Sequence, residues 1–346
     1  MLRYDCMSLF ISLRHCVVVC TYLDMFLLGL AASESKNPVN DIVVFGSINQ
    51  DLYSYTERFP QPGETVIGKS FKSGAGGKGA NQAAQAARLG AKTAMIGCVG
   101  DDVFGPLNIE ALKKSGVNTD FIEICSDSCT GTATIIVNNE GENMIVVAPG
   151  ANYDMTPEFA DKHDKVIASA KIILCQNEIK PHITKRAFEF AKRNNVKTFL
   201  NFAPATADYD KDLFNLVDIL CTNETETEIL SDIRVNNAND AQNAAEKLLS
   251  DGYEAVIITL GANGVYVADK NGLREHLDVS PVTAVDTTGA GDSFCGAFAF
   301  YMVTRPDLSL AEQCRRAAEV ATISVQHQGT QSSFPFAKDL PRELIE

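Results

Sequence analysis

The feature that most constrains the fold is a repeated alternation of short apolar runs, rich in β-branched residues, with amphipathic helical patterns. Stretches such as 106–116 and 241–252 have the helical pattern. Continuous apolar runs between helices predict a parallel sheet that helices cover on both faces. Such sheets bind ligands at the carboxyl ends of their strands. The runs that we predict as buried strands are 40–48, 92–100, 171–177, 196–202, 217–223 and 254–261.

Two stretches break this alternation. Residues 51–73 and 130–149 alternate between apolar and polar side chains, and the second contains the turn-forming sequence Asn-Asn-Glu-Gly-Glu-Asn at 138–143. These patterns are typical of exposed strands and of a hairpin. We therefore expect an α/β protein with a small second sheet, formed from about 51–73 and 124–150, that covers a site as a lid.

The charge limits the partners of the protein. The chain of 346 residues has 30 basic and 44 acidic residues, a net charge of −14. Such a chain repels nucleic acid and anionic membranes, so we expect neither as a partner of the folded body. A bound nucleotide would need backbone amides, a helix terminus or a metal ion.

The ten cysteines show neither a paired zinc-binding pattern nor a disulfide framework. Free thiols indicate a reducing compartment, which predicts a cytoplasmic location or a nuclear one as well. We treat residues 1–38 as an N-terminal extension and 39–346 as the folded domain. Within the extension, 16–33 is similar to the apolar part of a signal peptide but contains Asp24, so a signal and an upstream extension with an alternative start at Met25 both stay open.

The segment 74–79, Gly-Ala-Gly-Gly-Lys-Gly, matches the glycine pattern of a dinucleotide-binding site. A dehydrogenase is therefore one alternative. The residues before these glycines are half polar, however, which is unlike a buried first strand. A phosphate-binding P-loop does not fit, because Gly79 follows Lys78 where that loop has Ser or Thr.

Polar residues follow several of the predicted strands. Asn49 and Asp51 come after the first strand, Glu178 follows another, and glycines surround Lys78 and Asn81. Glycine lets the backbone approach a ligand closely. The shared position of these residues at strand ends favours a pocket for a small polyol, although each residue alone is typical of a turn or a helix cap.

The sequence Val-Asp-Thr-Thr-Gly-Ala-Gly-Asp, 285–292, precedes an apolar helix. Its Gly-Ala-Gly turn offers amides and the positive end of a helix dipole to phosphoryl oxygens. Asp292 could accept the proton of a hydroxyl group that attacks phosphorus. The alternative is an ordinary acidic residue at a helix N-terminus.

Two further segments have the composition of a nucleotide site. Asn223 and Glu226 lie three residues apart at a predicted helix start, where they could order the water shell of Mg²⁺ or simply cap the helix. Residues 259–264 leave a strand through two glycines, which suits either a nucleotide lying against the backbone or a turn.

Together these segments resemble the ribokinase family of carbohydrate and nucleoside kinases over residues 40–340. The resemblance depends on GSINQD, GGKGANQAAQAARLGA, TGTATIIVNNEGEN, NETETEIL, IITLGANGV, VDTTGAGDSFCGA and GTQSSFP, in this order. It implies a three-layer α/β/α domain with a small β lid. It also implies phosphorylation of D-ribose at the 5-hydroxyl by ATP, with Mg²⁺ and K⁺ as cofactors and a homodimer formed through the lid.

The resemblance also implies roles for individual residues. Asp292 would be the general base, and the amides of Gly289, Ala290 and Gly291 would form the anion hole. Ribose would be bound by Asn49, Asp51, Gly77, Lys78, Gly79, Ala80, Asn81 and Glu178, next to Asp292. ATP would contact Asn223, Thr259, Leu260, Gly261, Ala262, Asn263, Gly264 and Gly291, with Glu226 organising Mg²⁺ through water. A monovalent cation would lie at Asp286, Thr288, Ser324, His327, Gly329 and Ser333.

The sequence leaves other substrates and one other function open. A deoxyribose, fructose or adenosine kinase would have the same fold, and a sugar sensor without catalysis would bind ribose but consume no ATP.

Overall fold

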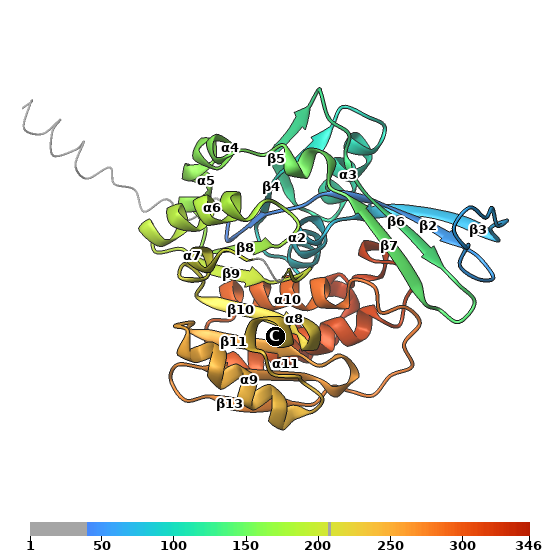
Figure 1. Cartoon of the computed structure of the whole chain (residues 1–346). Helices are drawn as coiled ribbons and strands as arrows, with labels where there is room; N and C mark the ends of the chain where they lie inside the picture. The colour runs from blue at the N-terminus through green and yellow to red at the C-terminus, as the bar shows by residue number, and fades with distance from the viewer. Residues whose placement is uncertain (1–39, 207–208) are drawn as a thin grey trace, which may run out of the picture. The chain divides into compact units, whose positions relative to one another are not determined.

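The computed structural model describes residues 40–206 and 209–346 (Figure 1). The predicted extension 1–38 lies outside the described residues. No helix in the described part of the chain is both long and apolar enough to cross a membrane.

A sheet of nine strands forms the centre of the domain, in the order β13-β12-β11-β10-β9-β8-β1-β4-β5. All neighbouring strands from β11 to β5 run parallel, and β12 and β13 are antiparallel additions at one edge. The prediction of a mostly parallel sheet is confirmed. The strands are β1 (Ile42–Phe45), β4 (Thr93–Gly100), β5 (Asn118–Cys125), β8 (Ile172–Gln176), β9 (Lys197–Asn201), β10 (Ile219–Asn223), β11 (Ala255–Thr259), β12 (Val265–Asp269) and β13 (Arg274–Leu277).

Helices cover both faces of this sheet, as the alternation of apolar runs and helical patterns predicts. In β1, Ile42 and Val44 belong to one apolar core and Val43 and Phe45 to the other, which is why its whole sequence is apolar. The first core is covered by α2 (Lys78–Arg88), α3 (Phe104–Lys114), α10 (Ala290–Thr304), α11 (Leu310–Ser324) and α12 (Arg342–Ile345). The second is covered by α4 (Pro157–Lys162), α5 (Asp164–Ala168), α6 (Pro181–Arg193), α7 (Lys211–Phe214), α8 (Glu224–Ser231) and α9 (Ala238–Ser250).

A second sheet of four strands projects from this body, in the order β3-β2-β6-β7 (Figure 1). The strands are β2 (Asn49–Tyr55), β3 (Ser70–Gly76), β6 (Gly131–Val137) and β7 (Asn143–Ala148). The predicted second sheet is therefore confirmed. Its boundaries differ from the predicted 51–73 and 124–150. β2 begins at Asn49 and β3 ends at Gly76, while Ile124 and Cys125 are the last residues of β5 in the large sheet.

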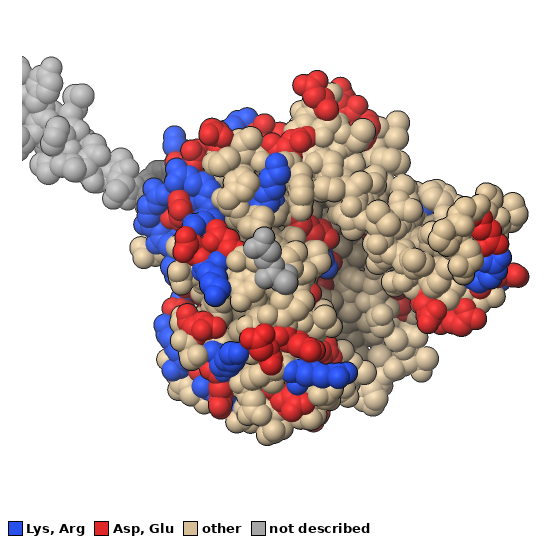
Figure 2. Space-filling view, viewed as in Figure 1, with Lys and Arg blue, Asp and Glu red and all other residues tan. Residues whose placement is uncertain are grey.

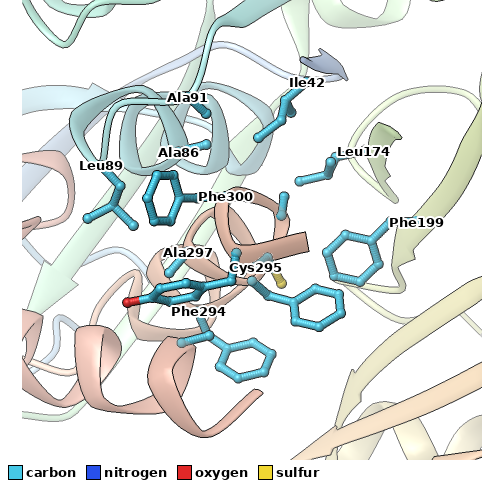
Figure 3. Close-up of a cluster of buried hydrophobic side chains, with 14 of the residues drawn as sticks. Ile42, Ala86, Leu89, Ala91, Leu174, Phe199, Phe294, Cys295, Ala297 and Phe300 are labelled. Carbon is cyan, nitrogen blue, oxygen red and sulfur yellow. The ribbon is translucent and has the colours of Figure 1, made fainter. Parts of the chain in front are cut away.

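Helices α2 and α10 pack closely, and Gly296 makes this possible. A Cβ atom at position 296 would lie 2.5 Å from the Gln82 carbonyl oxygen and 2.8 Å from Gln85 Cβ. Figure 3 shows the apolar side of this contact, with Phe300 of α10 beside Ala86 of α2 and Leu89, which follows α2. The backbone of α2 cannot move away without disturbing the core that both helices share.

We predict that Gly296→Ala destabilises the fold by about 2 kcal/mol, because overpacking outweighs the gain of about 1 kcal/mol in helix propensity. Urea unfolding measures the change. Gly291→Ala in the same helix is the matched control, since a Cβ there meets nothing within 4 Å. Equal stability of the two variants would contradict the argument.

Candidate active site

The candidate residues gather at the carboxyl ends of the central strands, beside the small sheet. Figure 2 shows the surface hollowed between the body and the projecting sheet. Gly46 and Ser47 follow β1, Glu178 follows β8, and Asn201 and Asn223 end β9 and β10. This is the edge of the sheet at which the sequence predicts a ligand.

The start of α2 lies unusually close to the end of β1. Gly77 has a φ of 86° and is the N-cap residue of the helix. A Cβ at Gly77 would lie 2.6 Å from the backbone nitrogen of Asn49, and one at Gly79 would lie 2.7 Å from that of Ser47. Only glycine fits these two positions, and their close approach directs the first turn of α2 toward the sheet edge.

Glu178 links this helix to the two sheets. Its carboxylate accepts hydrogen bonds from the Lys78 backbone N–H at 3.0 Å and from the Ser47 hydroxyl at 2.5 Å. The amide of Asn49 in the small sheet also donates to it, at 3.5 Å. The acceptor oxygens of Glu178 thus lie where β8, α2 and β2 meet. Ala80, by contrast, directs its side chain into the apolar core, although it was among the expected substrate residues.

Asp51 is a buried carboxyl group in β2. Burial raises the pKa of Asp51 to about 7, and the negative charges of Glu178 and Asp292 add to this while hydrogen bonds from Tyr53 and Thr330 oppose it. The Tyr53 hydroxyl donates to Asp51 at 3.2 Å and also lies 3.2 Å from the Thr330 hydroxyl. Three carboxyl groups therefore face one another across the small sheet and the body.

Asp292 occupies the first turn of α10 and is only 6% exposed. Asn81 donates to one carboxylate oxygen at 2.9 Å and Gln82 to the other at 3.0 Å. The amide of Gln331 in turn donates to Asn81 Oδ1 at 3.1 Å. The carboxylate of Asp292 is thus held from both sides by buried amides.

Lys78 is the cationic group of this cluster. Burial would lower the pKa of Lys78, but the carboxylates of Asp292, Glu178 and Glu226 outweigh it and raise the pKa above its usual value. The ammonium group therefore stays charged, which suits an anionic ligand. Lys78 lines a pocket of about 190 Å³ together with Asp292, Glu226, Asn223 and the turn Gly289–Gly291.

A larger and mostly apolar pocket of about 360 Å³ lies next to it and shares Thr259, Thr287, Ala290 and Gly291 as lining residues. Gly261, Ala262 and Gly264 of the predicted nucleotide loop also line this pocket, with Val279, Val282 and Phe294 among its apolar residues. Two residues of the loop lie elsewhere. Leu260 is buried in the core, and Asn263 lines a different pocket, so their side chains do not reach this site.

Asn223 and Glu226 form a helix capping box. The Asn223 side chain accepts the Glu226 N–H at 2.9 Å, and the Glu226 carboxylate accepts the Asn223 N–H at 2.8 Å. Burial raises the pKa of Glu226 to about 6, with the Asn223 hydrogen bond and Lys78 opposing the shift. The plain capping interpretation therefore holds, and the same residues also line the small pocket. In the described part of the chain, no group of three His, Cys, Asp or Glu side chains is arranged to hold a metal directly.

The expected monovalent-cation residues come from two segments that Asp286 joins. Its carboxylate accepts the N–H groups of Thr288 at 3.0 Å and Gly329 at 2.9 Å. The hydroxyl groups of Ser324 and Ser333 are buried and donate to backbone carbonyls. The side chain of His327 is exposed.

The glycine-rich segment 74–79 is not a dinucleotide site. Gly74 and Gly76 belong to β3, which pairs with β2 in the small sheet, and no strand of the large sheet leads into α2 through them. This geometry removes the dehydrogenase alternative.

Sequence reasoning missed several buried polar residues of the site. Ser47, Gln82, Asn152, Gln176, Asn201 and Gln331 are each less than 9% exposed, and each hydrogen-bonds an expected site residue or a partner of one. The strand-end position of Ser47, Gln176 and Asn201 was the available signal for three of them.

Comparisons with known proteins agree with this geometry. The sequence matches the pfkB family of carbohydrate kinases over residues 39–337. The chain belongs to the pfkB carbohydrate kinase family. Among curated members it is 49% identical to mouse ribokinase over 88% of this chain and 94% of that protein. It is 38% identical to the deoxyribokinase of Salmonella typhi over 85% of this chain and 95% of that protein.

Solved structures of the pfkB family include close matches to the fold. The structure of Arabidopsis thaliana ribokinase complexed with ribose and ATP has a TM-score of 0.81 and 32% identity, covering 89% of this chain and 99% of that one. The agreement extends over both sheets, because it spans nearly all described residues.

The raised pKa of Asp51 predicts a pH dependence of stability. A carboxyl group with a pKa of 3.8 when unfolded and about 7 when folded favours the folded state at low pH, and this contribution is lost as the pH rises through 7. Asp51→Asn should therefore stabilise the protein more at pH 8 than at pH 5, by roughly 1–2 kcal/mol. Urea unfolding at both pH values measures the difference. Asp120→Asn, an exposed aspartate in β5, controls for the loss of one charge, and the same pH response in both variants would contradict the prediction.

Proposed function

We propose that the protein transfers the γ-phosphoryl group of ATP to the 5-hydroxyl of D-ribose, giving ribose 5-phosphate and ADP. The observation that carries the proposal is the position of Asp292 between two sites. On one side lie the hydroxyl-binding groups of Asn49, Asp51, Asn81 and Glu178, and on the other lies the pocket at the N-terminus of α10. The extensive identity with mouse ribokinase supports ribose as the acceptor.

Ribose would be bound by the polar cluster around the start of α2. Carboxylates of Asp51 and Glu178 accept hydroxyl hydrogens, and the amide groups of Asn49 and Asn81 both donate and accept. The backbone at Gly77 and Gly79 can come close to the sugar because no Cβ intervenes. The small sheet would cover the sugar as a lid, since β2 contributes both Asn49 and Asp51.

Asp292 would act as the general base. Its carboxylate takes the proton of the 5-hydroxyl while the hydroxyl oxygen forms a bond to the γ-phosphorus, and the bond from phosphorus to the bridging oxygen breaks, so that ADP leaves with the electron pair. The amides of Gly289, Ala290 and Gly291 would receive the charge on the phosphoryl oxygens, helped by the dipole of the 15-residue helix α10.

ATP would lie with its base in the apolar pocket and its phosphates toward Lys78. Asn223, Thr259, Gly261, Ala262 and Gly264 line the two pockets that it would occupy. The buried carboxylate of Glu226 fits a magnesium ion bound through water, because Mg²⁺ prefers oxygen ligands and keeps part of its hydration shell. When bound, Mg²⁺ supplies positive charge to the transferring phosphoryl group.

A monovalent cation such as K⁺ would bind where Asp286 holds segments 286–288 and 324–333 together. Backbone carbonyl and hydroxyl oxygens from these segments suit such an ion. Its expected effect is to order the turn that precedes α10, because Thr288 is hydrogen-bonded to Asp286 and directly precedes Gly289.

We further propose a cytoplasmic homodimer formed through the small sheet. β7 lies at the edge of that sheet, and its side chains Met144, Ile145, Val146 and Val147 are 46–70% exposed. An apolar edge strand of this kind is a site for pairing with another chain. Sedimentation velocity distinguishes a dimer from a monomer.

ADP release by the purified protein with MgATP tests the acceptor. We expect the highest kcat/KM with ribose, lower values with deoxyribose, fructose and adenosine, and a loss of activity when Na⁺ replaces K⁺. A preference for deoxyribose would keep the kinase and overturn ribose as the substrate, which is a real test because a deoxyribokinase is among the relatives. Ribose binding without turnover of any acceptor would point to a sensor.

For the general base we predict that Asp292→Asn lowers kcat by about 10³-fold or more, while ribose and ATP binding change little. Asparagine preserves the shape of the side chain and cannot take the proton. Rapid-quench kinetics and isothermal titration calorimetry measure the two effects. Activity within tenfold of wild type would rule out this role of Asp292.

A further inference from the structure

The carboxylate of Asp292 is reached by a chain of buried amides that no proposed substrate contact requires. Gln82, on the second turn of α2, donates through Nε2 to Asp292 Oδ1 and to Asn201 Oδ1, both at 3.0 Å. Its Oε1 accepts from Gln176 Nε2 at 2.7 Å. Gln82 is fully buried and is absent from the lining of both pockets, so it touches the carboxylate from behind the site.

The direction of these hydrogen bonds is fixed by the neighbours of Gln82. The Asp292 carboxylate can only accept, and Asn201 presents its oxygen because its NH₂ group donates to the Cys221 carbonyl. The NH₂ group of Gln82 must therefore face these two residues, which leaves its oxygen to accept from Gln176. A flipped amide would place its oxygen against the carboxylate and its NH₂ group against that of Gln176. The flipped orientation costs much more free energy than the observed one, because buried polar groups without partners are costly.

The two carboxylate oxygens of Asp292 are held differently. Oδ2 accepts from Asn81, which belongs to the proposed ribose cluster, and Oδ1 accepts from Gln82. The bond from Gln82 is therefore the one that persists whether or not a sugar rearranges Asn81. It fixes the rotation of the carboxylate, so that a free lone pair is left for the incoming hydroxyl proton.

We propose that Gln82 is a positioning residue for Asp292 and that Gln176 supports its amide by donating to the side-chain oxygen. This inference rests on the proposed role of Asp292 as general base. Gln82 contributes to the transfer step by fixing the proton acceptor, and it contributes little to the binding of ribose or ATP.

The chain offers a matched control. Gln85 lies one turn further along α2 and is equally buried. Its side chain makes two hydrogen bonds where that of Gln82 makes three, donating to the Pro335 carbonyl oxygen at 3.1 Å and accepting from the Ser293 hydroxyl at 2.9 Å. It makes no hydrogen bond to Asp292. Gln82→Met and Gln85→Met therefore remove the same chemistry from the same helix, but only the first reaches the carboxylate.

Steady-state kinetics across pH are the first measurement. For Gln82→Met we expect kcat to fall by about 10–100-fold with both KM values within about threefold, because misplacing a reacting group costs rate more than binding. The acid limb of the kcat profile should move to higher pH, since the charged form of the carboxylate loses a donor. The acid limb of Gln85→Met should lie at the same pH as that of the wild type. Its melting temperature should fall by about as much as that of Gln82→Met.

The groups that carry charge near Asp292 are unchanged in both variants. They are Lys78 of α2, Asp51 of β2, Glu178 after β8 and Glu226 of α8, while burial raises the pKa of the Cys295 thiol in α10 and keeps it neutral. A shift of the acid limb is therefore caused by the loss of the Gln82 amide. If the acid limbs of Gln82→Met and Gln85→Met coincide, Gln82 is a structural residue and the proposal is wrong.

A second readout does not depend on turnover. The carboxyl ¹³C resonance of Asp292, assigned by its loss in Asp292→Asn, should move in Gln82→Met and stay in place in Gln85→Met. Gln176→Met should move the Asp292 resonance in the same direction by a smaller amount. This variant takes the place of Gln82→Met if Gln82→Met does not fold. An unmoved resonance overturns the positioning role. Absence of ribose phosphorylation by the wild type would instead overturn the proposed function, and the resonance would still test the contact.

Discussion

The close approach of the first turn of α2 to the end of β1 is the constraint on which the site depends. With a Cβ at Gly77 or Gly79, the helix could not start within contact of the Ser47 and Asn49 backbone. That contact lets Glu178 accept the Lys78 N–H and the Ser47 hydroxyl at once. It also carries the next residues of the helix over the sheet edge, where they meet α10. One local feature of the backbone thus aligns two helices, two sheets and the carboxylates between them.

The electrostatics of the site follow from this arrangement. The carboxyl groups of Asp292, Glu178 and Glu226 act on the ammonium group of Lys78, and Asp51 lies near two of them. The resulting excess of negative charge is tolerated because Asp51 and Glu226 have raised pKa values. A site with this excess of carboxyl groups suits an anionic ligand that binds together with a cation. Backbone amides rather than further lysines serve the phosphates, which is consistent with the acidic composition of the chain.

The sequence predicts the fold well where strands are buried on both faces. Val43 and Phe45 alternate with Ile42 and Val44 in an unbroken apolar run, and such runs leave little choice but a parallel sheet. Three strands of the large sheet were missed. The edge strand β13, Arg-Glu-His-Leu, has three exposed polar residues, and the edge strand β5 mixes polar with apolar residues, whereas β12 was missed although it is apolar and buried. The central residues of the site could be predicted from strand ends and glycines.

The amides around Asp292 could not be predicted from the sequence. Glutamine is most often a surface residue, and Asn81, Gln82 and Gln85 recur at helical spacing among alanines, which is the pattern of an exposed polar face. In α2, however, all residues from Gly79 to Ala86 are buried. Only the tertiary packing of α10 against α2 reveals that these side chains form a polar layer inside the protein, so no local pattern distinguishes Gln82 from Gln85.

The missing side chain at Gly291 has a consequence for ligand chemistry. Nothing lies within 4 Å of where its Cβ would be, and the residue lines both the polar and the apolar pocket. The two chambers therefore share an open wall, and one molecule can pass through it. An inhibitor whose adenosine group and phosphate chain extend through both chambers, and whose far end has a sugar-like polyol beyond Asp292, would gain contacts that a nucleotide analogue alone does not make.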